Sequence, residues 1–217
     1  MDNTDIDTEW VLRLDADEFL TKELRWEIGE KLDSLPNRVT GVELRRRIIF
    51  MGRWIKHGGI YPTILLRIFR KNAGRCEQTI MDEHIVLDHG KVVRFKNDFV
   101  NDDIKSLSWW IKKHDWYADR EVLDYLQNIS DITAANGVKM RLLGSQPERK
   151  RWLKYKLYYR IPGRIRVFLY YLYRMYVCGG FLDGVPGFYF HFFQAYWYRM
   201  LVDAKLYEAN SKKGSGC

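Results

Sequence analysis

Hydrophobic residues in the first half of the chain gather in short runs whose lengths predict β-strands. Trp10–Leu14 is an apolar run of strand length interrupted only by Arg13, and Val39–Phe50 and Thr63–Arg70 carry apolar residues between basic or polar ones. Segments of this kind are typical of strands. The chain between and after them is expected to form a loop at Gly52–Pro62, a turn at Lys71–Gly74, and two short extended segments, Glu77–Leu87 and Gly90–Lys96.

A helical spacing of apolar residues occurs at three other places. Leu and Ile recur every three or four residues in Thr21–Leu35, where Thr21 is a candidate N-terminal cap and Pro36 ends the pattern. Leu107–Leu126 has the clearest apolar face, and an aromatic helix is expected near Phe188–Tyr207. Together, these strands and helices predict an α/β fold with a mixed sheet and flanking helices.

Composition divides the chain into three parts. Residues 1–127 hold the predicted strands and two helices, residues 128–149 form a polar linker, and residues 150–217 are rich in aromatic and basic side chains. The chain has 217 residues, of which 47% are hydrophobic, and a net charge of +8. This hydrophobic content is sufficient for a folded core and excludes wholesale disorder.

The sequence favours a cytosolic setting. Its cysteines are odd in number and widely spaced, which disfavours a disulfide framework or a cysteine zinc site and fits a reducing compartment. They are Cys76, Cys178 and Cys217. The acidic, polar N-terminus is not a secretory signal, and no uninterrupted apolar run approaches the ~20 residues needed to span a bilayer.

Three acids, Asp15, Asp17 and Glu18, come directly after the predicted strand Trp10–Leu14. In an extended chain, two residues one position apart point to the same side, so the two aspartates could hold one hard divalent cation. Open α/β sheets bind ligands at the carboxyl ends of their strands, where these acids would lie. Two other interpretations stay open, namely that Asp17 caps the next helix or that the acids form a solvated turn.

A second polar group, Asp82, Glu83 and His84, follows the predicted strand Thr63–Arg70. Transfer of a sugar to a hydroxyl requires a base that takes the hydroxyl proton, and a carboxylate can do this. It also requires neutralisation of the leaving diphosphate, which a metal ion can provide. Alternatively, Glu83 is a surface partner of Arg67 or Arg70, and His84 is a partly buried structural histidine.

In its motifs the chain resembles family 2 glycosyltransferases of the GT-A fold, particularly bacterial enzymes of lipopolysaccharide core and surface-polysaccharide assembly. The similar segments follow the family order and cover nearly the whole chain. They are Trp10–Phe19, Gly52–Gly59, Leu66–Lys71, Met81–His84, Trp110–Ala118 and Gly180–Gly187. The resemblance implies that residues 1–127 are the C-terminal portion of a GT-A (Rossmann-like) domain, and that residues 150–217 are a helical extension.

The resemblance also implies a function. It implies inverting transfer of a sugar from a nucleotide-diphospho-sugar to a saccharide or lipid-linked acceptor, in the cytoplasm at the inner face of the plasma membrane. Asp15 and Asp17 would bind Mg or Mn and the donor diphosphate. The general base would lie in Asp82-Glu83, with Glu83 preferred. The candidate substrate-binding residues are Trp54, His57, Arg67 and His84.

Two features depart from the family pattern. Nucleotide-binding strands precede the Asp-x-Asp strand in the family, whereas nine residues precede Trp10 here. We therefore expect the chain alone to be inactive and to need a complementing N-terminal chain. The alternative function is that of a non-catalytic remnant, or half of a split enzyme, that binds an acceptor or a membrane. The second departure is Asn101, because relatives often have histidine in this region.

Residues 150–207 interleave aromatic residues with Lys and Arg. This composition is typical of amphipathic helices that lie on a membrane interface, and it predicts peripheral membrane contact. Helices that simply pack against the catalytic domain are a second interpretation, and single-stranded nucleic acid is a third. Nucleic acid is not expected as a partner, because no recognisable nucleic-acid-binding module is present.

Overall fold

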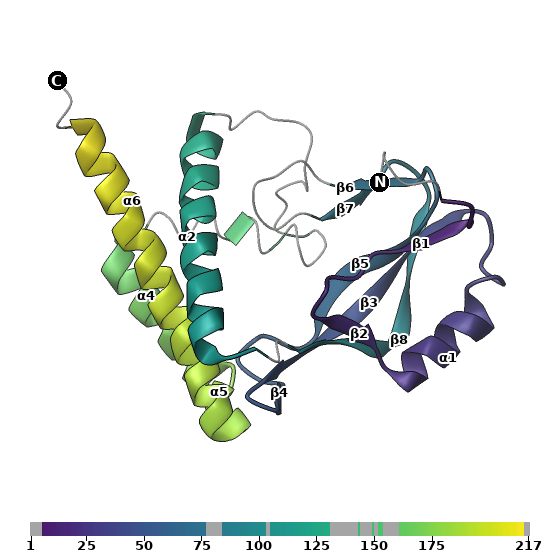
Figure 1. The fold of residues 1–217 in the computed structure, drawn as a ribbon, viewed down its shortest axis with the longest axis horizontal. Coiled ribbons are helices and arrows are strands. Elements are labelled where there is room, and N and C mark those ends of the chain that lie inside the picture. The colour runs from purple at the N-terminus through teal and green to yellow at the C-terminus, as the bar shows by residue number, and fades with distance from the viewer. Residues whose placement is uncertain are drawn as a thin grey trace.

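The computed structural model describes residues 6–76, 84–102, 105–130 and 161–214, together with residues 143, 149, 152 and 153. Strands lie at one end of the molecule and long helices at the other (Figure 1). The predicted α/β class, with a mixed sheet and flanking helices, is confirmed.

The main sheet has six strands in the order β1-β5-β3-β8-β2, with β4 paired to the end of β3. β3 and β8 are parallel, and the other neighbouring pairs are antiparallel. The sheet strands are β1 (Trp10–Leu12), β2 (Glu18–Leu20), β3 (Val39–Phe50), β4 (Arg53–Ile55), β5 (Thr63–Arg70) and β8 (Lys91–Asp102). A separate hairpin consists of β6 (Gly74–Cys76) and β7 (Ile85–Leu87).

The long strands β3 and β5 have the predicted bounds, but the predicted loop Gly52–Pro62 was only partly correct. β4 begins inside it, because a two-residue turn at Met51 and Gly52 brings the chain back onto β3. Met51 has a φ of 50° and Gly52 a φ of 73°. Positive φ at both positions is typical of a two-residue hairpin turn, because it matches the twist of the paired strands. Such turns favour Asn, Asp or Gly at the first position, so Met51 gave no sign of this one.

Helix α1 (Lys22–Lys31) covers one face of the sheet. The predicted cap is confirmed, because the Thr21 hydroxyl accepts a hydrogen bond from Leu24 N at 3.2 Å. The helix ends before the predicted Leu35, where the Ser34 hydroxyl donates to the carbonyl of Lys31 at 2.8 Å. Beneath α1 lies a core of buried side chains, which are Leu24, Val42, Leu44, Ile68, Phe95 and Phe99.

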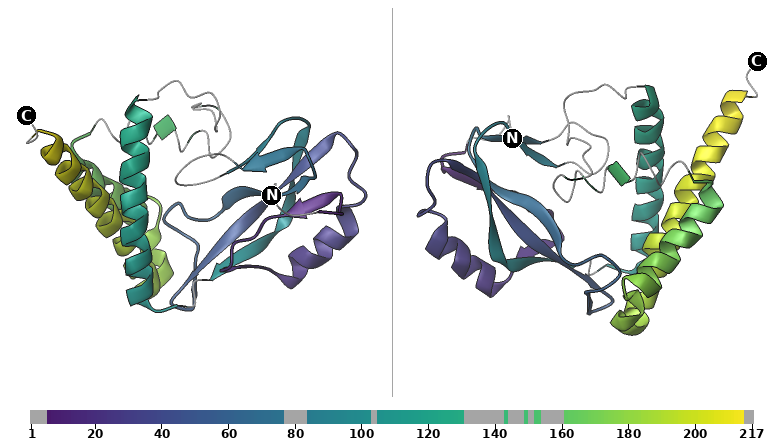
Figure 2. Two further views of the ribbon diagram at one scale, coloured as in Figure 1. Left: turned by 45° about the horizontal axis from the view of Figure 1, so that its top comes forward. Right: turned by 180° about the vertical axis from the view of Figure 1, so that it is seen from behind.

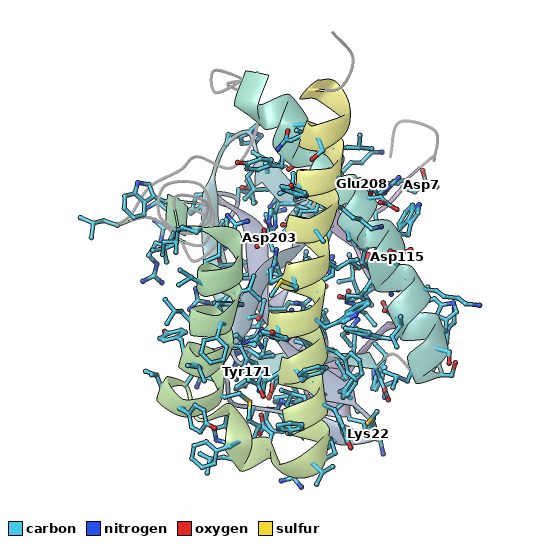
Figure 3. The ribbon with its side chains drawn as sticks, turned by 90° about the vertical axis from the view of Figure 1, so that its left-hand side faces the viewer. Asp7, Lys22, Asp115, Tyr171, Asp203 and Glu208 are labelled. Atoms are coloured by element: carbon cyan, nitrogen blue, oxygen red, sulfur yellow. The ribbon has the colours of Figure 1, made fainter. Side chains whose placement is uncertain are left out.

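The remaining helices pack together and onto the end of the sheet. They are α2 (Leu107–Ser130), α4 (Gly163–Leu172), α5 (Gly184–His191) and α6 (Tyr198–Gly214), joined by the short helical turns η2 (Tyr173–Val177), η3 (Gly180–Asp183) and η4 (Phe192–Trp197). α6 lies between α2 and α4 (Figures 2 and 3). α2 continues to Ser130, into the first residues of the predicted linker 128–149.

Two further cores join these helices to the sheet and to one another. The first connects the β3–β4 region with α2 and α5 through Phe50, Ile55, Ile60, Trp110 and Phe190. The second connects α2 with α6 through Ala118, Val122, Tyr198, Val202 and Leu206. Within the described ranges, no helix combines the length and apolarity that crossing a membrane requires.

Candidate functional site

The acids after β1 form a tight turn. The carbonyl of Asp15 accepts a hydrogen bond from Glu18 N at 3.0 Å, and Glu18 Oε2 accepts one from Asp15 N at 3.2 Å. Asp15 thus occupies the first position of a β-turn, which favours Asp. The expectation that Asp15 and Asp17 share one extended strand is wrong, because here the chain passes from β1, at one edge of the sheet, to β2, at the other.

Glu18 fixes this turn to the sheet through Arg67 of β5. Arg67 Nη2 donates to Glu18 Oε1 at 2.6 Å and to Asp15 Oδ2 at 3.1 Å. The Glu18 side chain has no exposed surface, and that of Arg67 is 9% exposed. Burial raises the pKa of Glu18, while the positive charge of Arg67 opposes the rise. The third acid therefore has a structural role that its sequence position did not reveal.

Asp17 is held separately from Asp15. Its carboxylate lies 3.3 Å from Lys113 Nζ of α2, and its carbonyl accepts a hydrogen bond from Asp102 N at 2.9 Å. The two aspartates thus contact different cationic side chains. In the part of the chain that the structure describes, no three His, Cys, Asp or Glu side chains are grouped to hold a metal ion. A cation at Asp15 and Asp17 would take further ligands from phosphate and water.

Trp54 lies in a second cluster, on β4. Arg47 and Lys56 each place their charged group 4.4 Å from the centre of the Trp54 ring, and Tyr61 meets the ring edge-on. Arg47 Nε and the Tyr61 hydroxyl donate to Asp98 at 2.7 and 3.1 Å, which fixes the cluster to β8. Trp54 Nε1 is buried and has no hydrogen-bond partner among the described residues.

His57 is held by Asp183, a buried carboxylate at the end of η3. Asp183 Oδ2 accepts hydrogen bonds from the backbone N–H groups of Lys56, at 3.1 Å, and His57, at 2.9 Å. Asp183 Oδ1 lies 2.7 Å from His57 Nδ1. A carboxylate only accepts, so Nδ1 carries the proton and Nε2 is the remaining ring nitrogen. The His57 side chain is 40% exposed, so a ligand can reach it.

Arg174 and His191 complete the support behind this loop. Arg174 Nε donates to the Gly58 carbonyl at 2.9 Å, and Nη2 donates to His191 Nδ1 at 3.0 Å. Burial and the charge of Arg174 lower the pKa of His191 to about 4, so the ring is neutral at pH 7. Gly58 has a φ of 68°, and a Cβ there would overlap the His191 ring. The loop Lys56–Gly58 is therefore locked to the C-terminal helices.

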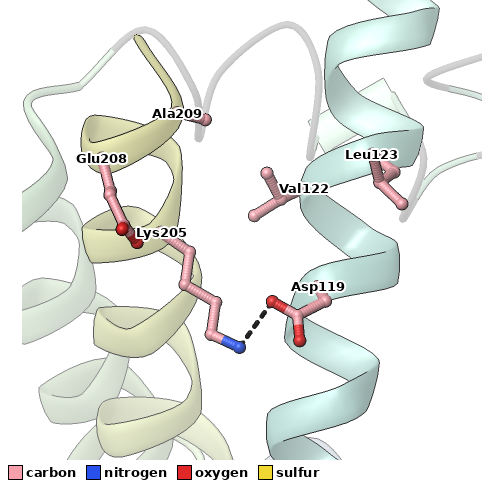
Figure 4. A pocket seen from close by; sticks show the side chains of 6 residues that line it. All are labelled: Asp119, Val122, Leu123, Lys205, Glu208 and Ala209. Atoms are coloured by element: carbon pink, nitrogen blue, oxygen red, sulfur yellow. Dashed lines mark hydrogen bonds and ion pairs between the residues drawn. The ribbon is translucent and has the colours of Figure 1, made fainter. Parts of the chain in front are cut away.

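Two surface depressions lie away from these clusters. One, of about 420 Å³, lies on the surface between α2 and α6 (Figure 4). Lys205 Nζ crosses it to Asp119 Oδ1 at 2.6 Å. The other, of about 460 Å³, is lined by Lys22, Glu23, Trp26 and Asn97. Neither is lined by a predicted site residue.

The structure brings together some predicted residues and not others. Asp15 meets Arg67, Trp54 belongs to the second cluster, and His57 is held separately by Asp183. His84 is half-buried just before β7, and Asp82 and Glu83 lie outside the described residues. Sequence reasoning missed Lys113 and gave no role to Asp183, although its segment Gly180–Gly187 had been singled out. No family model matches the chain, and no solved structure matches it.

Proposed function

We propose that the protein is a family 2 glycosyltransferase of the GT-A fold. It would move a sugar from a nucleotide-diphospho-sugar to a saccharide or lipid-linked acceptor in bacterial cell-surface glycan synthesis, at the cytoplasmic face of the plasma membrane. The observation that supports this most is the fixed acidic turn Asp15–Glu18. Arg67 orients the Asp15 carboxylate. The Asp15 side chain is 52% exposed, so a ligand can still reach it.

The acidic turn has the chemistry to hold Mg or Mn. Carboxylate oxygens suit these hard cations, and Asp15 and Asp17 would be the ligands from this chain. Lys113 would have to leave Asp17, whereas Arg67 is retained by its bond to the buried Glu18. When bound, the cation would neutralise the charge that develops on the leaving diphosphate.

The remaining residues are assigned to the acceptor. Glu83 would take the proton from the acceptor hydroxyl as that oxygen bonds to the anomeric carbon, opposite the departing diphosphate, so that the configuration inverts. His57 Nε2, on the loop after β4, is a hydrogen-bonding nitrogen that suits a sugar hydroxyl, and Trp54 lies three residues earlier on β4. The positive charges of Arg47 and Lys56 beside them suit an anionic acceptor.

Asp17→Ala is expected to weaken Mn-dependent binding of the donor about tenfold or more, because even outer groups of metal sites contribute about 10–100-fold. Calorimetry with a panel of nucleotide-diphospho-sugars and Mn measures this, on the chain complemented with nucleotide-binding strands of the same family. Asp33→Ala, at an exposed aspartate after α1, is the control and should bind like the parent chain. An unchanged donor affinity in folded Asp17→Ala would remove Asp17 from the metal site.

Glu83→Gln is expected to lower turnover by roughly 10²-fold while donor affinity stays near normal, because general bases typically contribute 10²–10⁴-fold. Asp82→Asn is the matched comparison at the neighbouring carboxylate. Turnover is measured at saturating donor and acceptor. If Asp82→Asn shows the loss and Glu83→Gln does not, the base is Asp82.

The alternative function is that of a non-catalytic remnant, or half of a split enzyme, that binds an acceptor or a membrane. The pairing of Asp15 with Arg67 and of Asp17 with Lys113 favours it, since paired carboxylates can be purely structural. Donor hydrolysis, measured for the chain alone and together with nucleotide-binding strands of the same family, decides between them. Hydrolysis by the chain alone supports a complete enzyme, hydrolysis only together with those strands supports half of a split enzyme, and hydrolysis by neither preparation supports a non-catalytic remnant.

A further inference from the structure

The helices α4 to α5 have an unusual distribution of polar and apolar side chains. Large apolar side chains on their outer face are between 47% and 75% exposed, among them Phe168, Tyr173, Val177, Phe181, Val185 and Phe188. In α4, Ile165, Phe168 and Leu169 recur at the spacing of a single helical face. An apolar surface of this extent is rare on a monomer in water and marks a site of interaction.

The inner face of the same segment carries ionisable side chains beside apolar ones such as Val167 and Phe190. Arg166, Arg174, Asp183 and His191 are each 7% exposed or less, although such side chains are usually exposed. They are paired inside the molecule, for example Arg166 with Asp203 and Arg174 with His191. This segment therefore buries its charged side chains together with part of its apolar ones and leaves further large apolar side chains exposed, which is favourable where the outer surroundings are themselves apolar.

The sequence of this region is basic. Between residues 161 and 202 there are four arginines and one acid, Asp183, which is buried. Exposed Arg53 places its guanidinium beside Gly184, at the start of α5. Basic residues next to exposed aromatic and aliphatic side chains complement the negative headgroups and the acyl boundary of an anionic lipid surface.

From these observations we propose that the outer face of α4, η2, η3 and α5 docks flat on an anionic lipid membrane. Within the described ranges no helix could cross the membrane, so this contact is peripheral. Asp183 of η3 holds His57, so docking would place the His57 loop next to the lipid surface. The inference deepens the proposed function and rests on it only for the lipid-linked nature of the acceptor.

Flotation with lipid vesicles tests the docking face. The protein is mixed with vesicles of phosphatidylcholine alone, or of phosphatidylcholine with phosphatidylglycerol, at low and high salt. The triple variant F168Q/V177Q/V185Q should have a partition coefficient into the mixed vesicles at least about tenfold below that of the parent chain, because three exposed apolar contacts are lost. The control W26Q/V92Q/L123Q changes equally exposed apolar residues on other elements and should partition like the parent chain.

The outcomes distinguish a lipid surface from a second copy of the chain as the partner of this face. Stronger partition into mixed vesicles, weakened by salt and by the triple variant alone, supports the proposal. Equal partition of both variants, or no vesicle binding, overturns it. It is also overturned if the parent chain is a dimer without lipid and the triple variant a monomer, because a second copy then covers the face. Donor binding is measured separately, so its failure would refute the glycosyltransferase and leave the lipid result intact.

Discussion

Arg67→Ala is expected to lower the free energy of unfolding by roughly 3–5 kcal/mol, because it leaves a buried carboxylate without its partner. Glu18 has no exposed side-chain surface and receives a 2.6 Å hydrogen bond from Arg67. Urea denaturation followed by circular dichroism measures the loss. The control is Arg75→Ala, which breaks an ion pair whose side chains are 48% and 53% exposed, and it should cost about 0–1 kcal/mol.

The same substitution is expected to make stability depend on pH. Burial already raises the pKa of Glu18 above its ordinary 4.5, and removing Arg67 takes away the charge that opposes this rise. The folded variant then binds the Glu18 proton more tightly than the unfolded chain does. The contribution of Glu18 to the stability of the variant should therefore be greatest below pH 4.5 and be lost as the pH rises through the folded-state pKa.

The pH dependence also separates an electrostatic effect from a loss of packing. Arg67→Ala/Glu18→Gln removes the titrating group, so its stability should vary less with pH than that of Arg67→Ala. If both variants lose the same stability at every pH, the role of Arg67 is packing against the Phe99 ring, whose centre lies 5.4 Å from the guanidinium.

The main strands could be predicted because their signals are local. Val39–Phe50 and Thr63–Arg70 are apolar segments bounded by turn residues, and the structure gives both the same bounds. The cap at Thr21 was predictable for the same reason. β4 was not, since its turn places Met51 in a left-handed conformation that the pattern gives no reason to expect.

The candidate site depends on contacts between residues far apart in the sequence, and these the sequence could not supply. Arg67 lies 49 residues from Glu18, and Asp183 lies 126 residues from His57. The acids of the Asp15–Glu18 turn were correctly identified as unusual. Their division into an exposed and a buried carboxylate depends on how the sheet places Arg67. The composition of α4 was equally visible, but which of its faces is buried depends on packing against α6.

Asp183→Ala is expected to release the Lys56–Gly58 loop from the C-terminal helices and to cost roughly 3–5 kcal/mol, because it leaves buried donors without an acceptor. Two backbone N–H groups and His57 Nδ1 donate to this carboxylate. Hydrogen exchange of the Lys56 and His57 amides should accelerate. The control Asp119→Ala removes a 58% exposed partner of Lys205, so it should cost about 0–1 kcal/mol and leave the exchange of both amides unchanged.

Asp183→Asn gives a finer test because it keeps the size of the side chain. One amide oxygen can still accept, but the amide N–H₂ group would face a donor that Asp183 now binds. We therefore expect a smaller loss of stability than in Asp183→Ala, with faster exchange on one side of the loop. Neutral His191 cannot take over as an acceptor, because its Nδ1 accepts from Arg174 and its Nε2, whose nitrogen lies 4.0 Å from Asp183 Oδ2, carries the ring proton and is a donor. Parent-like exchange in both Asp183 variants would mean that Arg174 alone holds the loop through the Gly58 carbonyl.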